Sequence, residues 1–302
     1  NLEKVTYSKG SQLVVTKQDS QKSIFSAGGL IYNSQRNDFA DLAGRMFSHL
    51  ELEKGKTVIL GDWHLARNLS WWTNYGSVVY LQPEKKIALE QGGFYNQDLK
   101  IKAVDLNNFL ENQGDWNWII LSPGSPQTLV GNRYYTLENL NLVKENLTSD
   151  GACALVFDLP VDYQSREALQ FGRIIYATFE KVFENVDLLV IEGWVVLIGS
   201  ESEIDYSLKD SSGLVEMVLS DSRRDELKQK LSGGSQVNTN RHPLAYFRHH
   251  LFWQTIFSFQ LPKLFRHLIL LIPISLGIVL VDMTRKFNRH QKLGLLVGLS
   301  GF

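Results

Sequence analysis

The sequence has little cysteine and little net charge, and each shortage excludes a class of protein. Cys153 is the single cysteine among 302 residues, so the chain can form neither an internal disulfide framework nor a CxxC metal site. The 31 basic and 32 acidic side chains give a formal net charge of −1, without the clustered basic excess that is typical of nucleic-acid-binding proteins. Because Cys153 stands in the apolar run ACALVF, we predict a buried structural thiol.

Internal repeats, low-complexity segments and an initiator methionine are also lacking. We expect no signal peptide in the polar start Asn1-Leu2-Glu3-Lys4. The sequence stops at Phe302 inside an apolar run, so we expect both ends to be cut from a longer chain.

A regular alternation of apolar segments is present instead, with 44% hydrophobic residues and enough length for a full core. Residues from about 5 to 32 predict short strands in a hairpin or small meander, and residues 38–52 have helical spacing. The predicted strands that follow are TVILG, SVVYLQ, LKIKAVD, WNWIILS, ACALVFDL, VDLLVIEG and WVVLIGS. The helical stretches predicted between them include LARNLSWWTNY, PEKKIALEQG and SREALQFGRIIYATFEKVF. This order predicts an α/β fold with a parallel-rich sheet and helices on both faces, in which WVVLIGS pairs with the strand before it.

The composition changes from about Pro243, where aromatic residues become frequent. Leu268 to Val281 is uncharged for 14 residues, fewer than the ~20 needed to cross a bilayer, so a buried core helix is one interpretation. The basic cluster RKFNRHQK and a second apolar run follow directly, which favours a transmembrane hairpin. The basic loop favours a cytoplasmic position and Lys263 and Arg266 oppose it, so the side of the globular domain stays open.

We therefore predict three parts and an integral membrane protein, of the bacterial inner membrane. Residues 1–36 form an N-terminal β-segment, residues 37–247 a Rossmann-like domain, and residues 248–302 a membrane-associated helix with transmembrane segments, the second of them truncated. In an open parallel sheet, ligands bind at the carboxyl ends of the strands where the strand order reverses. Chemistry is therefore expected after four strands, in the segments that begin at Gly61, Tyr80, Asp105 and Ser122.

Four ordered segments carry a resemblance to a known family. They are SQLVVTKQDSQKSIFSAGGLIYNSQRNDFADLA, GNRYYTLENLNLVKENLTSDGACALVF, QVNTNRHPLAYF and HHLFWQTIFS. The chain resembles the spermidine synthases, or polyamine aminopropyltransferases, in their membrane-fused branch, over about Ser11 to Ser258. The resemblance implies a methyltransferase-type Rossmann-like sheet after a small β-segment. It also implies transfer of an aminopropyl group from decarboxylated S-adenosylmethionine to an amine such as putrescine.

The same resemblance assigns the family's cofactor pocket to positions where this sequence departs from the motif. A glycine-rich turn is reduced to Gly61, followed by Asp62 and Trp63, and Tyr80 stands where the family has an acid for the ribose hydroxyls. A phenol cannot act as a bidentate acceptor. Asp105 keeps the acid that contacts adenine in the family.

The family's amine site is also changed. Ser122 and Ser125 replace the two acids of its D-x-x-D motif, and an unactivated serine is not a competent base near neutral pH. Tyr135 matches the amine-contacting tyrosine, and Asn240 stands where aspartate is usual. We therefore predict a catalytically inactive domain without cofactor, acting as a structural or partner-binding module. Partners would be the membrane and other protein subunits, with no nucleic acid.

Two alternatives stay open. One is an active aminopropyltransferase that uses decarboxylated S-adenosylmethionine with a carboxylate supplied from elsewhere, such as Asp158 or Asp162; the other is a nucleoside-binding sensor without turnover. A metal or proton relay at His64 beside Asp62 is less favoured than a loop that Trp63 plugs. We expect no metal site, and interpret the histidines near the membrane segment as interfacial: His242, His249 and His250.

Overall fold

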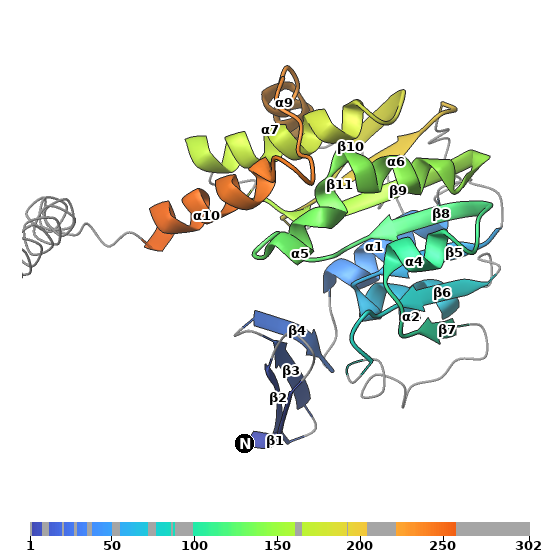
Figure 1. Cartoon of the computed structure of the whole chain (residues 1–302), viewed down its shortest axis with the longest axis vertical. Helices are drawn as coiled ribbons and strands as arrows, with labels where there is room; N and C mark the ends of the chain where they lie inside the picture. The colour runs from blue at the N-terminus through green and yellow to red at the C-terminus, as the bar shows by residue number, and fades with distance from the viewer. Residues whose placement is uncertain are drawn as a thin grey trace, which may run out of the picture. The chain divides into compact units, whose positions relative to one another are not determined.

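The computed structural model describes residues 2–7, 12–19, 21–26, 29–34, 38–49, 55–71, 77–85, 87, 99–160, 165–191, 193–203 and 222–257. Its main feature is a seven-stranded sheet in the order β10-β11-β9-β8-β5-β6-β7 (Figure 1). The strands are β5 (Thr57–Leu60), β6 (Val78–Leu81), β7 (Leu99–Lys102), β8 (Trp116–Leu121), β9 (Leu147–Asp158), β10 (Asn185–Ile191) and β11 (Trp194–Ser200). This mostly parallel α/β architecture is the predicted one.

Five parallel strands of this sheet end at the same edge. β5 pairs in parallel with β6 and with β8, β6 pairs with β7, and β8 pairs with β9. β11 runs antiparallel to both β9 and β10, which confirms that WVVLIGS pairs with the preceding strand. The order reverses at β5, so the crevice that such sheets use for ligands lies outside the ends of β5 and β8.

A separate four-stranded sheet comes first in the chain. β1 (Leu2–Tyr7), β2 (Gln12–Gln18), β3 (Gln21–Ser26) and β4 (Gly29–Asn33) pair antiparallel in sequence order. The predicted meander is therefore confirmed, although it starts at Leu2 rather than near residue 5. Leu13, Val15 and Ile24 are buried on one face of this sheet.

Helices cover both faces of the large sheet (Figure 1). They are α1 (Asp38–His49), α2 (Trp63–Trp71), α4 (Leu106–Leu110), α5 (Leu129–Asn132), the 3-10 helix η1 (Arg133–Tyr135), α6 (Leu137–Glu145), α7 (Arg166–Glu180), α9 (Ser222–Leu231) and α10 (Leu244–Phe257). α1 and α2 contact each other, and their apolar stripes share one core cluster with alternate residues of the strands, such as Ile59, Ile120 and Ile198. Cys153 is buried in β9 and free, as predicted.

One local prediction was wrong. The loop expected at Trp63 and His64 is the first turn of α2, because Asp62 caps the helix earlier than the apolar pattern indicated. The helix predicted at residues 83–92 falls largely outside the described residues.

The C-terminal part of the chain is described only as far as Phe257. Contacts group Asn1–Phe252 into one compact unit, which includes most of α10. Within the described ranges, no helix combines the length and the apolar character that a bilayer span requires. The apolar segment Leu268–Val281, for which we predict a membrane span, lies outside them.

Candidate functional site

The end of β5 turns sharply at Gly61. Its φ is +101°, and a Cβ built on it would lie 1.9 Å from the carbonyl oxygen of Ser122. The backbone amide of Ser122 also donates to the carbonyl oxygen of Leu60 at 2.8 Å. Any other residue at position 61 would clash with backbone, so the contact between the ends of β5 and β8 accounts for this glycine.

Asp62 is used as a helix cap. Its Oδ1 accepts a hydrogen bond from the backbone amide of Leu65 at 2.9 Å, which satisfies one of the free N–H groups at the start of α2. Burial raises the pKa of the Asp62 carboxyl group, and the Leu65 amide and the nearby His64 partly offset this. His64 Nε2 donates to the carbonyl oxygen of Asn33, which links α2 to β4.

Two aromatic side chains fill the space next to this turn. The rings of Trp63 and Tyr80 meet edge to face with centroids 5.3 Å apart, and both residues are buried. The Tyr80 hydroxyl donates to the carbonyl oxygen of Gly61 at 3.2 Å and accepts from Nε2 of Gln82 at 3.2 Å. A hydrogen bond from the Tyr80 side chain in β6 to the backbone after β5 therefore joins the two strand ends.

The indole nitrogen of Trp63, unlike the Tyr80 hydroxyl, makes no hydrogen bond within the described part of the chain. The atom is buried, and the described residues offer it no hydrogen-bond acceptor. A buried donor left without a partner costs about 1–3 kcal/mol. The aromatic packing around Trp63 must offset that cost for the side chain to stay in place.

Asp105 follows β7, and its carboxylate is already bound by other groups of the protein. Its side chain accepts from the backbone amide of Asn107 at 3.2 Å and caps α4, and it forms an ion pair with Arg133. The Tyr134 hydroxyl donates to Asp105 at 3.2 Å, and the Arg133 guanidinium lies 4.8 Å above the Tyr134 ring centroid. Burial raises the pKa of Tyr134, and the adjacent Arg133 partly counteracts this.

The loop after β8 contains Ser122, Gly124 and Ser125 and has no acidic residue. Tyr135, wholly buried in η1, donates its hydroxyl to the carbonyl oxygen of Gly124. Burial, and next the charge of Asp158, raise the pKa of Tyr135 well above its usual range. Asp158 ends the neighbouring strand β9, where partial burial raises the pKa of its carboxyl group.

Comparisons with known proteins agree with this geometry. Solved structures of spermidine synthases superpose on the chain, one from Thermotoga maritima with a TM-score of 0.53 and 14% identity over 82% of this chain and 84% of that one. A spermidine synthase in complex with the transition-state analogue AdoDATO gives a TM-score of 0.53 and 14% identity over 82% and 83% of the two chains. The chain has the spermidine synthase fold.

Sequence similarity to curated proteins is more distant. A polyamine aminopropyltransferase of Oceanobacillus iheyensis is 25% identical over 146 residues, which cover 44% of this chain and 27% of the relative. The chain therefore spans about a quarter of the length of that curated relative. No family model matches the chain. We describe it as a spermidine-synthase-like domain, related distantly in sequence and more fully in fold.

The structure brings the sequence-predicted positions of this spermidine-synthase-like domain into two groups. Gly61, Asp62, Trp63 and Tyr80 adjoin at the ends of β5 and β6, and Gly61 also contacts Ser122. Asp105 belongs to a second group with Arg133 and Tyr134, the two residues that precede Tyr135 in η1. Whether these positions are vestiges of a cofactor site and an amine site stays a prediction.

Asn238 is a residue whose importance the sequence did not reveal. It is wholly buried; its Nδ2 donates to the carbonyl oxygen of Tyr135 at 2.9 Å and to Oδ1 of Asn132 at 3.2 Å, and its Oδ1 accepts from the amide of Ala245 at 3.1 Å. Its amide donates to Oγ1 of Thr178 at 2.9 Å. The side chain of Asn238 joins α5, η1 and the start of α10, and its backbone amide adds a bond to α7. The QVNTNRHP segment was the signal available, since it was matched to a family motif.

The two histidines of α10, His249 and His250, contact other parts of the domain. His249 is buried with its ring 5.4 Å from that of Phe171, and burial, then the neighbouring His250, lowers its pKa to about 4. His250 Nε2 lies 3.2 Å from the carbonyl oxygen of Gln127. Within the described residues, no three His, Cys, Asp or Glu side chains gather as metal ligands would.

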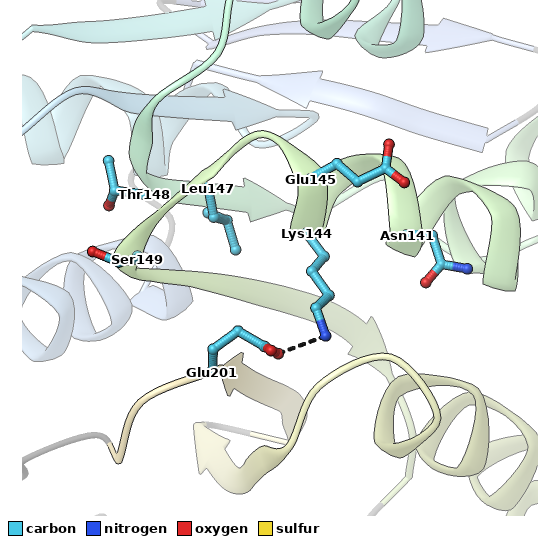
Figure 2. A pocket seen from close by; sticks show the side chains of 8 residues that line it. Asn141, Lys144, Glu145, Leu147, Thr148, Ser149 and Glu201 are labelled. Atoms are coloured by element: carbon cyan, nitrogen blue, oxygen red, sulfur yellow. Dashed lines mark ion pairs between the residues drawn. The ribbon is translucent and has the colours of Figure 1, made fainter.

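A cavity of about 380 Å³ lies at the opposite edge of the sheet. Its walls come from the end of α6, the start of β9 and the residue after β11 (Figure 2). Lys144 pairs there with Glu201 at 2.7 Å and donates to the carbonyl oxygen of Val182 at 2.9 Å. No residue singled out as a candidate from the sequence lines this cavity.

Proposed function

We propose that this chain is a membrane-anchored, spermidine-synthase-like domain that transfers no aminopropyl group and serves as a structural or partner-binding module. The observation that carries the proposal is at the end of β8. Between Asp115 and Glu138 the sequence has no acidic residue, and the loop presents Ser122 and Ser125 instead. Membrane anchoring rests on the sequence from Leu268 onward.

The chemistry of the reaction explains why this substitution matters. An amine that attacks the donor must lose a proton, and a positioned base contributes typically about 10²–10⁴ in rate. A serine hydroxyl supplies neither that base nor a negative charge for an ammonium group. Both functions would therefore have to come from another residue.

The ends of β5, β6 and β7 support the same proposal. Tyr80 donates its proton to Gly61 and accepts from Gln82, so its hydroxyl is already used on both sides. Asp105 is neutralised by Arg133 and caps α4. A nucleoside at this edge would have to displace Trp63 and Tyr80, which are packed against each other.

Asp158 favours a second candidate, an active aminopropyltransferase with a relocated carboxylate. It stands one strand away from the end of β8, close enough for its charge to raise the pKa of the Tyr135 hydroxyl. A raised pKa brings the Asp158 carboxyl group closer to the range of a general base. This arrangement would keep a base next to the tyrosine that resembles the family's amine contact.

Calorimetric titration and a turnover assay together separate the candidates. The full chain in detergent or vesicles is titrated with decarboxylated S-adenosylmethionine, methylthioadenosine and S-adenosylmethionine, and then incubated with putrescine while spermidine is measured. We expect no binding and no product. Turnover that is lost in Asp158→Asn but kept in Asp150→Asn, an exposed control in the same strand, would establish the active enzyme. Binding without product would establish a sensor.

A restoration experiment tests the reason for inactivity. In the double variant Ser122→Asp, Ser125→Asp, both acids return to the loop after β8. We expect it to stay inactive, because Trp63 and Tyr80 still fill the neighbouring space. Product formation by this variant would show that the serines alone silence the site and that the aromatic packing does not close it.

A further inference from the structure

α10 exposes apolar side chains on the face that points away from the domain. Ala245 and Phe252 are buried, whereas Phe247 and Leu251, four residues apart, are 55% and 44% exposed. A helix on a water-exposed surface normally carries an apolar stripe on one side and polar residues on the other. α10 carries apolar side chains on its buried side and on its exposed side. Its outer face is therefore suited to contact with an apolar or interfacial environment rather than with bulk water.

α5 continues this apolar surface. Leu129 and Val130 are 59% and 66% exposed. The His250 ring contacts the carbonyl oxygen of Gln127 at 3.2 Å, and the Tyr246 amide donates to Asn132 at 3.1 Å, so α10 lies along α5 (Figure 1). We call the four exposed side chains Leu129, Val130, Phe247 and Leu251 the apolar patch.

The charge of the two segments that carry the apolar patch is one-sided. Residues 123–132 and 236–257 contain no Asp or Glu, and their charged residues are Arg241 and Arg248. Amphipathic surfaces that lie in a membrane interface combine apolar side chains with Lys or Arg, because the cations are attracted to anionic lipid headgroups. This composition is suited to an anionic lipid surface.

The chain beyond α10 gives the second argument for lipid. Residues 258–267 separate α10 from the uncharged segment Leu268–Val281, and ten residues span at most about 35 Å. Under the membrane anchoring proposed above, on which this inference rests, Phe257 at the end of α10 stays within that distance of a bilayer, and Leu251 of the apolar patch precedes it by six residues. The local concentration of lipid at the patch is then high, so even weak contacts would be populated.

We propose that the apolar patch lies in the headgroup region of an anionic bilayer, so that the carboxyl edge of the sheet faces the membrane. α5 begins at the end of the loop that follows β8, and α10 is tied to Tyr135 through Asn238. The lipid surface would then cover the side of the domain on which spermidine synthase folds are open to substrates. Such an arrangement suits a module that has no substrate to admit.

Depth-dependent fluorescence quenching tests this placement in the full chain. Leu129→Cys and Phe247→Cys are each labelled with an environment-sensitive dye and reconstituted in phosphatidylcholine vesicles with phosphatidylglycerol, whose acyl chains carry bromine or doxyl quenchers. Asp150→Cys is the matched control, since it is exposed at the opposite end of β9. The native Cys153 is buried, and burial raises the pKa of its thiol, so it should not take up label.

We expect quenching of about twofold or more at the two patch positions, from insertion of ~5–10 Å into the interface, and none at position 150. Equal quenching at all three positions would overturn the inference but leave the anchoring intact. The same holds if no position is quenched and the chain still withstands alkaline extraction. Extraction of the chain by alkali would overturn both. Energy transfer between labels on two copies, without lipid quenching, would assign the patch to self-association and also overturn it.

A charge variant gives an independent readout. Phe247→Asp places a carboxylate in the patch, while Gln254→Asp changes the same exposed side of α10 two turns later. We expect Phe247→Asp to lose the quenching at position 129, and Gln254→Asp to keep most of it. Circular dichroism checks that both variants fold. Unchanged quenching at position 129 in Phe247→Asp would contradict the proposal.

Discussion

The two edges of the parallel strands use their side chains in different ways. At the carboxyl edge, Trp63 and Tyr80 are buried against each other and the polar groups of Asp62 and Asp105 cap helices. At the amino-terminal edge, an ion pair lines a cavity of about 380 Å³ (Figure 2). Sheets of this class normally bind ligands at the first edge. In this chain, aromatic side chains are packed at the carboxyl edge of the sheet, whereas the cavity lies at the opposite edge.

The largest effect is expected from opening the carboxyl edge. Trp63→Ala should lower the free energy of unfolding by about 3–5 kcal/mol, because it leaves a cavity under α2. The matched control is Trp71→Ala in the same helix, where the ring is 58% exposed and holds Arg67 at 5.0 Å, a contact worth ~0.5–1 kcal/mol. Urea unfolding measures both. Equal losses would mean that Trp63 is not packed as core and would remove the contrast between the edges.

An intermediate effect is expected at the cap of α2. Asp62→Ala should cost about 1 kcal/mol, because the amide of Leu65 loses its acceptor. Asp62→Asn keeps a good cap and cannot ionise. Burial raises the pKa of Asp62, so the native state favours the protonated acid. Protonation of Asp62 therefore stabilises the native state below pH ~4, and this stabilisation is lost as the pH rises through the native pKa.

Asp62→Asn should therefore be at least as stable as the parent at pH 7, and its advantage should shrink toward pH 4. Urea titrations at several pH values between 4 and 7 measure the difference. If Asp62→Asn is instead less stable at neutral pH by as much as Asp62→Ala, the ionised carboxylate contributes more than a cap, and a functional interpretation of Asp62 regains support.

The smallest effect is expected at the amino-terminal edge. The side chains of Lys144 and Glu201 are 33% and 43% exposed, so water screens the pair. Glu201→Gln should change the free energy of unfolding by less than about 1 kcal/mol. The charge-reversed pair Lys144→Glu, Glu201→Lys serves as the control. A loss as large as that of Trp63→Ala would show that this edge is also part of the stabilising core.

Much of the fold could be predicted from the sequence, because its signals are local. β11 (Trp194–Ser200) matches the predicted strand residue for residue, and α7 lies within the predicted helix, since apolar periodicity and Ser165 at the cap define it. The short helix α4 was missed because five residues give too little periodicity. The start of α2 was misplaced because Trp63 suggested a loop, whereas the cap at Asp62 decides the helix.

The candidate site was predictable as a set of positions but not as a set of contacts. The sequence placed Asp105 and Ser122 after parallel strands, where the structure also has them, whereas Tyr80, also expected at a strand end, lies within β6. It could not show that Arg133 neutralises Asp105, because 28 residues separate the two. The hydrogen bonds of Asn238 to Tyr135 and Thr178 were equally hidden, since these partners lie far away in the sequence.

By itself, the sequence determined the succession of strands and helices along the chain, most of the positions that follow the parallel strands and the absence of acids between Asp115 and Glu138. These depend on residue type and spacing along the chain, which a sequence states directly. Only the tertiary structure decided that the Tyr80 hydroxyl turns back to Gly61, and that α10 shows apolar side chains on its outer face. Hydrogen-bond partners and exposure depend on which distant segments pack together, and no local pattern contains that information.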